Sequence, residues 1–278
     1  MSNSVITILS GLGTRDTSVS IAKAIFMQYA PGAAIVDIAH NVAQYDLQQA
    51  AYLLVSAYQH FPKGTIHVLP VDVFAGDVPR MLLAEKNNYF FIAPDNGVLP
   101  LAFGTELVNT RLCYEFSNSF SFTDWLQSAG RVIEAILTGN TSSFIQHKVD
   151  SVPRLLQPKV MHDGIDCNIL FIDRYENVVL DITKTQFGEL VNNRPFRIKL
   201  MRMGDITAIS NNYNDVQEGK PLCRFNSAGF LEIALNHAKA TTLFGLDADN
   251  TSNLRYRTIK IFLPHISAHA NIQSITPL

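Results

Sequence analysis

The feature that most constrains the fold is the change of hydrophobic period along the chain. In the first hundred residues, short apolar runs rich in β-branched residues alternate with segments of helical spacing. The expected strands are 5–9, 33–40 and 65–73, the expected helices are 18–30 and 47–61, and a hairpin at 81–94 precedes a helix that starts near 96. Strands that alternate with helices predict an α/β domain with a central, mostly parallel sheet and right-handed crossovers.

The pattern changes near residue 150. The segment 151–165 carries two prolines and has no clear period, which is typical of a linker. After it come short, turn-separated apolar runs at 167–182, 196–210, 220–235 and 257–263. This spacing predicts a small β-barrel or sandwich. The sequence therefore predicts an α/β domain over 1–150, a linker over 151–165, and a C-terminal β-barrel domain over 166–278.

Composition excludes several classes of protein. Hydrophobic residues make up 47% of the 278 residues and the net charge is −2, which excludes a disordered chain and gives no basis for binding nucleic acid or an anionic membrane. No apolar run approaches the ~20 residues of a membrane span, and the N-terminus lacks the features of a signal peptide. The three cysteines lie far apart, which favours a reducing, cytoplasmic compartment. The charged fraction of 17% is low and suggests surface buried in an oligomer.

The stretch LSGLGTRD, residues 9–16, is a glycine loop between an expected strand and an expected helix. A dinucleotide fingerprint needs a third glycine where this chain has Asp16, and no Gly-Lys-Ser/Thr follows for a Walker loop. Asp16 is instead expected to cap the helix over 18–30. The loop is interpreted as a tight turn at the carboxyl end of a strand, an edge that faces the ligand crevice in α/β sheets.

Two other carboxylates follow expected strands. Asp72 ends the third strand, where either a catalytic role or a loop-capping role is open. Asp46 is expected to cap the helix over 47–61. The eight histidines show no ligand spacing such as HExxH, so no metal site is predicted, and no G-x-S-x-G elbow is present.

Six stretches in fixed order resemble one protein family. They are Ser10–Asp16 with Lys23, Ile35–His40 with Asp46, Phe61–Asp72, Ala93–Gly97, Ile172–Asn177 and Asn226–Asn236. The pattern is similar to that of the S-adenosylmethionine (SAM) hydroxide adenosyltransferase family, which also includes SAM-dependent chlorinases and fluorinases. The match spans nearly the whole chain.

The resemblance implies a subunit of two domains, an α/β domain followed by a β-barrel. It also implies a homotrimer that holds SAM between the N-terminal domain of one subunit and the C-terminal domain of the next. The reaction of the family is displacement at the ribose C5′ by hydroxide or halide, with release of methionine. SAM is then a substrate or ligand, and no separate cofactor is expected.

The resemblance assigns five positions of the second domain to the ligand. Asp173 matches the carboxylate that meets the methionine ammonium, and Asn177 matches the amide that reads the adenine edge. Tyr175 and Tyr213 match aromatic positions around the adenine, and Ser227 matches a residue at the methionine end. The alternative is that this Asp and Asn only make a turn at a strand end.

The first-domain half of the pocket departs from the family pattern. Gly11 stands where the family has an Asp that grips the ribose hydroxyls, in a loop that is still expected to contact ligand. Tyr45, after the second strand, is a further candidate for ligand binding.

The water-preparing set of the hydrolases is Asp, Arg and His, and this chain keeps only part of it. Asp72 stands at the position of the Asp. The family pattern has two adjacent arginines; Pro79 stands at the first of these positions, and Arg80 matches the second. Ser121 stands where the hydrolases have the histidine. Halogenases also lack that histidine, and Ser121 is compatible with a halide pocket without indicating one.

Two hypotheses follow. In the first, the protein is a divergent hydrolase that converts SAM to adenosine and methionine, with Asp72, Arg80 and Ser121 at the reaction centre. In the second, it is a descendant that binds SAM or adenosine without turnover, because the ribose carboxylate and the histidine have been replaced. Losing a general base costs ~10²–10⁴ in rate.

Overall fold

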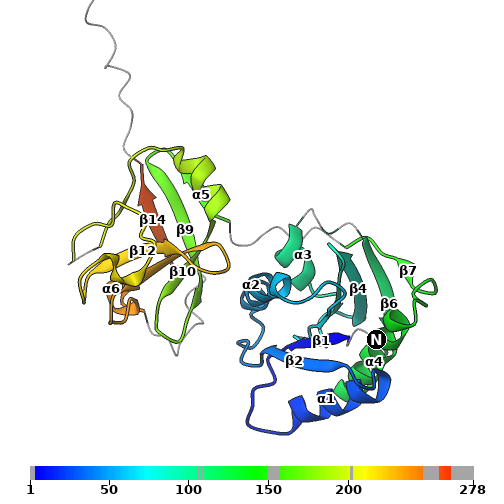
Figure 1. The fold of residues 1–278 in the computed structure, drawn as a ribbon. Coiled ribbons are helices and arrows are strands. Elements are labelled where there is room, and N and C mark those ends of the chain that lie inside the picture. Colours follow the sequence, from blue (N-terminus) through cyan, green and yellow to red (C-terminus); the bar gives the residue numbers. More distant parts are fainter. Residues whose placement is uncertain are drawn as a thin grey trace, which may run out of the picture. The chain divides into compact units, whose positions relative to one another are not determined.

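The computed structural model describes residues 4–104, 107, 109–149, 157–200, 203–246 and 257–263. The chain forms two compact units, Met1–Leu155 and Leu156–Leu278 (Figure 1). The first is an α/β domain and the second is a mainly antiparallel β domain, as the change of hydrophobic period predicts.

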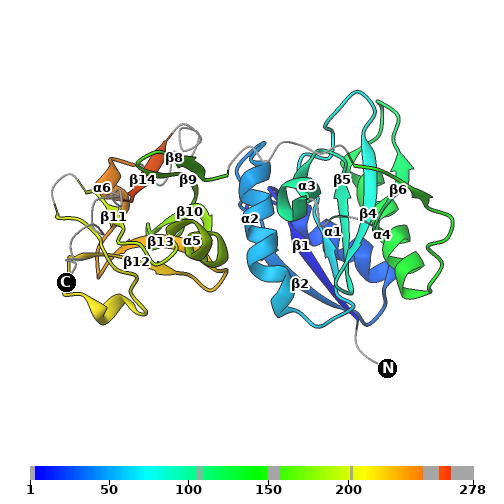
Figure 2. The ribbon, with the colours of Figure 1, turned by 90° about the horizontal axis from the view of Figure 1, so that it is seen from above.

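The first unit is built on a seven-stranded sheet with the order β2-β1-β3-β5-β4-β6-β7 within the described residues (Figure 2). The strands are β1 Val5–Leu9, β2 Ala34–Ala39, β3 Ile66–Val68, β4 Arg80–Lys86, β5 Tyr89–Pro94, β6 Asn109–Glu115 and β7 Ile145–Gln146. The β2, β1, β3 and β5 strands are parallel, whereas β4, β6 and β7 join by antiparallel pairing. The sheet is mixed because the predicted 81–94 hairpin turns β4 back along β5.

Helices cover both faces of this sheet. They are α1 Ser18–Tyr29, α2 Leu47–Ala57 with the 3-10 turn η1 Tyr58–His60, α3 Val98–Phe103 and α4 Phe122–Leu137. Buried residues of α1 and α4 share one core cluster, and those of α2 and α3 share another. The helix expected to begin after Asp46 does so, because the Asp46 side chain accepts a hydrogen bond from the Gln49 amide at 3.0 Å.

The parallel strands place their carboxyl ends along one edge of the sheet. The loops that contain Gly11, Tyr45 and Asp72 follow β1, β2 and β3 there. Because β4 runs in the opposite direction, its first residue Arg80 also lies at this edge, and Arg80 pairs in register with Glu115 at the end of β6. The edge is the place where ligands bind in open α/β sheets.

The second unit contains a curled antiparallel sheet with the order β11-β14-β9-β10-β13-β12, with β8 pairing β9. The elements are β8 Lys159–Met161, β9 Gly164–Ile172, β10 Val178–Thr183, α5 Lys184–Val191, β11 Arg197–Ile198, η3 Tyr213–Asp215, β12 Pro221–Phe225, β13 Phe230–Leu235, α6 Thr241–Phe244 and β14 Thr258–Phe262. Inward-facing aliphatic residues of the strands form one buried cluster. The short helices α5 and α6, in the described part of this unit, are additions to the all-β pattern expected from the sequence.

The expected linker over 151–165 needs a correction. Residues 151–156 lie outside the described residues, but Lys159–Met161 pairs with Gly164–Asp166 as a hairpin of the second sheet. Two prolines hid this hairpin because proline lowers strand propensity, yet both lie outside the paired residues.

Candidate ligand-binding site

The turn between β9 and β10 is built around the side chain of Asp173. Its Oδ1 accepts hydrogen bonds from the backbone amides of Tyr175 at 2.8 Å and Asn177 at 2.9 Å. Its Oδ2 accepts from Nδ2 of the Asn177 side chain at 2.9 Å. Glu176 has a positive φ of 61°, which the turn requires. The turn chemistry that the sequence left open is therefore present, and a carboxylate that accepts three bonds retains room for one more.

A cleft of about 770 Å³ opens beside this turn. It is lined by residues of the β9–β10 turn, of η3 and of the segment after β13: Arg174, Tyr175, Glu176, Asn177, Tyr213, Asn214, Leu235, Asn236, His237, Ala238 and Lys239. Three predicted ligand residues, Tyr175, Asn177 and Tyr213, meet in it. Tyr175 is 80% exposed, whereas Asn177 is 4% exposed. The volume suits a nucleoside-sized molecule.

Tyr213, in η3, is held in place by contacts to both its hydroxyl and its ring. The Tyr213 hydroxyl donates to Oε1 of Glu232 at 2.8 Å, and the Arg224 guanidinium lies 4.7 Å from the centre of the Tyr213 ring. Burial and the neighbouring Glu232 raise the pKa of Tyr213, and burial raises the pKa of Glu232. The ring of Tyr213 is thus fixed as one wall of the cleft.

Two predicted ligand residues are not among those that line this cleft: Asp173, whose side chain closes the turn beside it, and Ser227. Ser227 is exposed in the β12–β13 turn and is not among the residues that line the cleft. That turn is closed by Asn226, whose Oδ1 accepts from the amides of Ala228 and Phe230. At the cleft itself, Glu176 and Lys239 supply charged groups. The Glu176 carboxylate pairs with the Lys239 ammonium and accepts a hydrogen bond from the Thr241 hydroxyl. The hydrogen bond from Lys239 lowers the pKa of Glu176.

In the first domain, the glycine loop is fastened to the segment after β2. The Leu12 amide donates to the Ser10 hydroxyl at 3.4 Å, and the Gly13 amide donates to the His40 carbonyl at 2.7 Å. These inward bonds use the amides that a phosphate cradle would need, which agrees with the missing glycine of the fingerprint. A Cβ on Gly11 would lie 3.0 Å from the Val42 carbonyl oxygen, so glycine is there for close backbone packing.

Asp16 follows this loop and was expected to be the N-cap of α1. The N-cap residue is Thr17, which makes no side-chain cap bond, so the expected position is wrong by one residue. The expected chemistry remains, since Asp16 Oδ1 accepts from the Ser18 amide at 2.9 Å. That backbone hydrogen bond lowers the pKa of Asp16.

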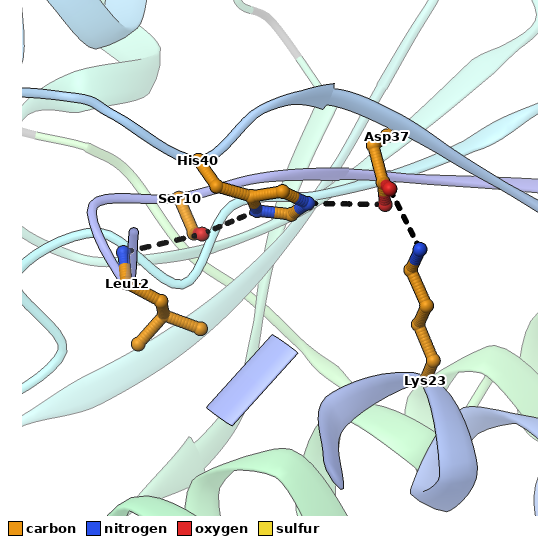
Figure 3. A network of polar contacts seen from close by, with 5 residues as sticks. All are labelled: Ser10, Leu12, Lys23, Asp37 and His40. Atoms are coloured by element: carbon orange, nitrogen blue, oxygen red, sulfur yellow. Dashed lines mark hydrogen bonds and ion pairs between the residues drawn. The ribbon is translucent and has the colours of Figure 1, made fainter. Parts of the chain in front are cut away.

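A chain of polar contacts lies beneath the glycine loop (Figure 3). The Ser10 hydroxyl lies 2.8 Å from His40 Nδ1, His40 Nε2 lies 3.0 Å from Asp37 Oδ1, and Lys23 donates to Asp37 Oδ2 at 2.6 Å. Burial acts to raise the pKa of Asp37, and the bonds from Lys23 and His40 outweigh it, so that pKa is lowered. The order Ser-His-Asp is that of a hydrolase triad, but Ser10 is fully buried and cannot reach a substrate. The chain of contacts holds the loop.

The remaining catalytic candidates lie in different surroundings. Asp72 has a positive φ of 48°, and its carbonyl, together with that of Val71, accepts from the Asn96 side chain. Arg80 Nε donates to Glu115 at 2.8 Å. A second cleft, of about 580 Å³, is lined by Arg80, by residues of the loops after β3 and β5, and by Val149 after β7. The loop residues are Ala75, Gly76, Asp77, Val78, Asp95, Asn96 and Gly97.

One histidine–carboxylate contact beside this cleft could not be predicted from the sequence. His147 Nε2 lies 3.1 Å from Asp95 Oδ2, and both side chains are mostly buried. Asp95 belongs to the recognised APDNG stretch, but no spacing rule connects it to a histidine 52 positions later. Only the folded structure brings the two together.

Ser121 and Tyr45 have local roles that the sequence did not assign. Ser121 is the N-cap of α4, and it forms a capping box with Asp124. The hydrogen bond from the Ser121 amide lowers the pKa of Asp124. Tyr45 is 65% exposed with a positive φ of 60°, just before the cap residue Asp46.

Neither a metal centre nor a membrane segment is found in the described parts of the chain. Within them, no group of three or more His, Cys, Asp or Glu side chains is placed to hold a metal ion. Their helices are all too short or too polar to span a bilayer.

Comparisons with known proteins agree with the sequence pattern. Residues 6–137 match the SAM hydroxide adenosyltransferase N-terminal domain, and residues 167–252 match its C-terminal domain. The (R)-S-adenosyl-L-methionine hydrolase of Thermus thermophilus is 27% identical over 252 residues, covering 86% of this chain and 94% of that protein. The hydrolase of Methanocaldococcus jannaschii is 25% identical over 87% of this chain and 92% of its own length. A fluorinase of an Actinoplanes species is 24% identical over 90% and 96%.

Solved structures share the fold. An uncharacterised conserved protein from Thermotoga maritima aligns with a TM-score of 0.76 at 24% identity, over 92% of this chain and 99% of that one. A conserved hypothetical protein from Thermus thermophilus aligns with a TM-score of 0.68 at 23% identity, over 94% and 100%.

Proposed function

The chain belongs to the SAM hydroxide adenosyltransferase family, and on this premise we propose that it binds SAM and hydrolyses it to adenosine and L-methionine. Relatives named as (R)-S-adenosyl-L-methionine hydrolases cover most of its length and support the proposal. A fluorinase or chlorinase activity, which would give a halogenated nucleoside in place of adenosine, is the less favoured outcome.

The cleft of the second domain is the observation that carries the proposal. Tyr175, Asn177 and Tyr213, which the resemblance assigns to the adenine, line one cleft although Tyr213 is distant from the others in sequence. Two aromatic rings and a buried amide form a surface that suits a flat heteroaromatic base. Asp173, next to them, keeps one acceptor position for the ammonium of the methionine moiety.

The reaction needs little catalytic assistance, because the sulfonium of SAM is already a good leaving group. The oxygen of water attacks C5′, the C5′–S bond breaks, and its electron pair leaves with sulfur as neutral methionine. The attacking water becomes strongly acidic as its bond to carbon forms, so a carboxylate suffices to take its proton. In this proposal Asp72 accepts the proton and Arg80 orients the water, with Ser121 at the place of the family's histidine. The protein mainly holds water and C5′ in line and excludes bulk solvent.

The proposal includes assembly and location. The subunits form a homotrimer, and SAM lies between the first domain of one subunit and the second domain of its neighbour. The low charged fraction of the chain supports burial of surface in an oligomer. The three cysteines are free, two buried and one partly buried, which supports a reducing, cytoplasmic environment.

A second candidate function is binding of SAM or adenosine without turnover. Two observations favour it. Gly11 packs against the Val42 carbonyl and offers no carboxylate to the ribose, and the Ser121 hydroxyl is engaged in the cap of α4.

Incubation with SAM and chromatography of the products separates the two candidates. Release of adenosine and methionine in equal amounts, above the rate of a buffer blank, supports the hydrolase. Binding of SAM by calorimetry without adenosine release supports the second candidate. Neither binding nor release at millimolar SAM would contradict both, and a monomer by light scattering would contradict the shared site.

A further inference from the structure

The cleft that contains Arg80 holds a carboxylate that the proposed reaction does not use. Asp95 lines this cleft, and its backbone amide donates to the Arg80 carbonyl at 3.0 Å. Asn96, the next residue, donates from its side chain to the carbonyls of Val71 at 2.8 Å and Asp72 at 3.3 Å. Asp95 therefore lies where the start of β4 and the loop that carries Asp72 come together.

His147 holds one oxygen of this carboxylate. Its Nε2 lies 3.1 Å from Oδ2 of Asp95, and the two side chains are 22% and 19% exposed. A carboxylate accepts hydrogen bonds and does not donate them, so Nε2 carries the proton of this contact. The backbone amide of His147 donates to the Thr110 carbonyl at 2.9 Å, which anchors the histidine to β6. The second oxygen of Asp95, Oδ1, makes no hydrogen bond with the described residues, so the cleft contains a fixed carboxylate with a free acceptor.

In-line attack at C5′ constrains every position around the oxygen of the attacking water. One lone pair must point at C5′, so both O–H groups must be directed away from it, and each needs an acceptor. In the proposed reaction Asp72 accepts one of the two hydrogens, and Arg80, which can only donate, faces the other lone pair. The second O–H, which becomes the 5′-hydroxyl of adenosine, still lacks an acceptor.

We propose that Asp95 is a catalytic residue that accepts a hydrogen bond from this second O–H, and that His147 is the positioning residue that aims its carboxylate. The inference rests on the proposed function, in which water attacks C5′ of SAM. The balance of the reaction is unchanged. The water oxygen bonds to C5′, the C5′–S electron pair leaves with methionine, one proton passes to Asp72, and the hydrogen that faces Asp95 stays on adenosine.

The carboxylate is tested by a pair of variants within one cleft. Asp95→Ala removes the acceptor, whereas Asp77→Ala removes an exposed carboxylate that lines the same cleft. Both variants lose one negative charge near a cationic substrate, so the comparison separates a hydrogen bond to water from attraction of the sulfonium. Asp95→Ala should lower kcat by about tenfold to hundredfold, and Asp77→Ala by less than about threefold.

The histidine is tested by a loss and a rescue. His147→Met removes the donor to Asp95 at a similar side-chain length, and His147→Gln keeps an N–H donor near the position of Nε2. His147→Met should lower kcat by about tenfold with KM within about threefold, while His147→Gln should stay within about threefold of the wild-type kcat. His67→Phe is the control for loss of a buried histidine, because His67 contacts Thr7 at 2.7 Å and does not line the cleft. It should leave kcat unchanged.

Initial rates of adenosine release over a range of SAM concentrations at pH 7.5, followed by chromatography, give kcat and KM for the wild-type protein and each variant. Circular dichroism and Trp125 fluorescence check that each is folded. A role of His147 in anchoring its segment alone predicts a lower stability of His147→Met with an unchanged kcat in the folded protein, which would overturn the inference.

The other outcomes are equally distinct. Asp77→Ala as slow as Asp95→Ala, a loss that falls only on KM, or His147→Gln as slow as His147→Met overturns the inference and leaves the proposed function standing. If the wild-type protein releases no adenosine from SAM, the proposed function fails and the inference fails with it. The two His147 variants decide the matter if Asp95→Ala does not fold.

Discussion

The two domains hold their polar side chains in different ways. In the second domain, one short turn supplies Asp173, Tyr175 and Asn177, and their mutual hydrogen bonds fix the wall of a cleft. In the first domain, Gly11 and Asp72 follow separate strands, and the contacts among neighbouring loops run through buried groups such as His40. A site carried by one turn is specified locally, whereas a site assembled from several strand ends can change one loop at a time. This difference fits the prediction from the sequence that the turn keeps the ligand-binding residues while the first-domain loops depart from the family pattern.

The domains also differ in a buried group whose pKa is shifted by burial. In the first domain, burial lowers the pKa of His67 to about 4, with Thr7 as its hydrogen-bond partner and Phe91 stacked on its ring. In the second domain, burial raises the pKa of Asp181 to about 6, against the hydrogen bonds from Asn168.

The largest expected effect is a pair of opposite pH dependences. His67 stays neutral when folded while the unfolded chain protonates below about 6.5, so the first domain should lose up to about 3 kcal/mol as pH falls from 6.5 to 4. Asp181 is protonated in the folded state below about 6 but ionised in the unfolded chain above 3.8, so the second domain should lose up to about 3 kcal/mol as pH rises from 4 to 6.

Urea unfolding between pH 4 and 7.5 measures both slopes. The single tryptophan, Trp125, is fully buried in the first domain, so its fluorescence reports that domain. Hydrogen exchange of β10 and β13 amides reports the second. Slopes of the same sign in both domains would contradict the assignment, and His67→Phe should flatten the first slope while Asp181→Asn flattens the second.

The next effect tests how much the turn of the second domain depends on its carboxylate. Asp173→Ala removes the acceptor of three hydrogen bonds and leaves Nδ2 of buried Asn177 without a partner. The cost should be about 2 kcal/mol in the second domain, since an unsatisfied buried polar group costs ~1–3 kcal/mol. The Trp125 transition should stay in place, and Ser227→Ala, an exposed change in another turn, should shift neither domain. A shift of less than about 0.5 kcal/mol, the size of an ordinary surface effect, would show that solvent replaces the carboxylate.

The sequence predicted those parts of the fold that depend on near neighbours. The cap at Asp46 and the hairpin at 81–94 are each decided within a few residues. So is the turn chemistry of Asp173, which the sequence left open as an alternative to ligand binding. The division into an α/β domain and a β domain also follows from hydrophobic period, which is read locally.

Contacts between distant segments could not be predicted. The close approach of Gly11 to Val42 depends on how two loops meet above parallel strands. The pair of Asp95 with His147 joins segments that no spacing rule connects. The two small helices of the second domain and the hairpin before β9 were missed because weak local preferences were overridden by pairing and packing.

A smaller effect is expected from Ser121, the residue that caps α4 in the first domain. Ser121→Ala removes the cap of α4, which should lower the stability of the first domain by about 1 kcal/mol. Urea unfolding followed by Trp125, which lies on α4, measures the change. Ser119→Ala, in the same exposed loop but outside the capping box, is the control. Equal stability of both variants would mean that the capping box contributes nothing and that the serine is retained for another reason.

The smallest effect compares one glycine from each domain. Gly11 and Gly188 both have ordinary negative φ, so alanine strains the backbone at neither position, and both substitutions reduce the entropy of the unfolded chain. At Gly188, in α5, a Cβ meets nothing within 4 Å, so Gly188→Ala should stabilise the second domain by about 0.5–1 kcal/mol. At Gly11, the Cβ would lie 3.0 Å from the Val42 carbonyl oxygen. Val42 cannot easily retreat, because its amide donates to the Ser10 carbonyl at 3.2 Å and Ser10 is tied to His40.

The crowding at Gly11 should therefore outweigh the entropic gain, and Gly11→Ala should destabilise the first domain by about 0.5 kcal/mol. Gly11→Asp carries the same Cβ and adds a carboxylate near that carbonyl, so its cost should be larger than that of alanine. Urea unfolding followed by Trp125 fluorescence measures the change in the free energy of unfolding of the first domain in Gly11→Ala. Hydrogen exchange of the α5 amides measures the change for the second domain in Gly188→Ala. If Gly11→Ala instead stabilises the first domain, Val42 moves freely, and the loop has room for a carboxylate side chain at this position.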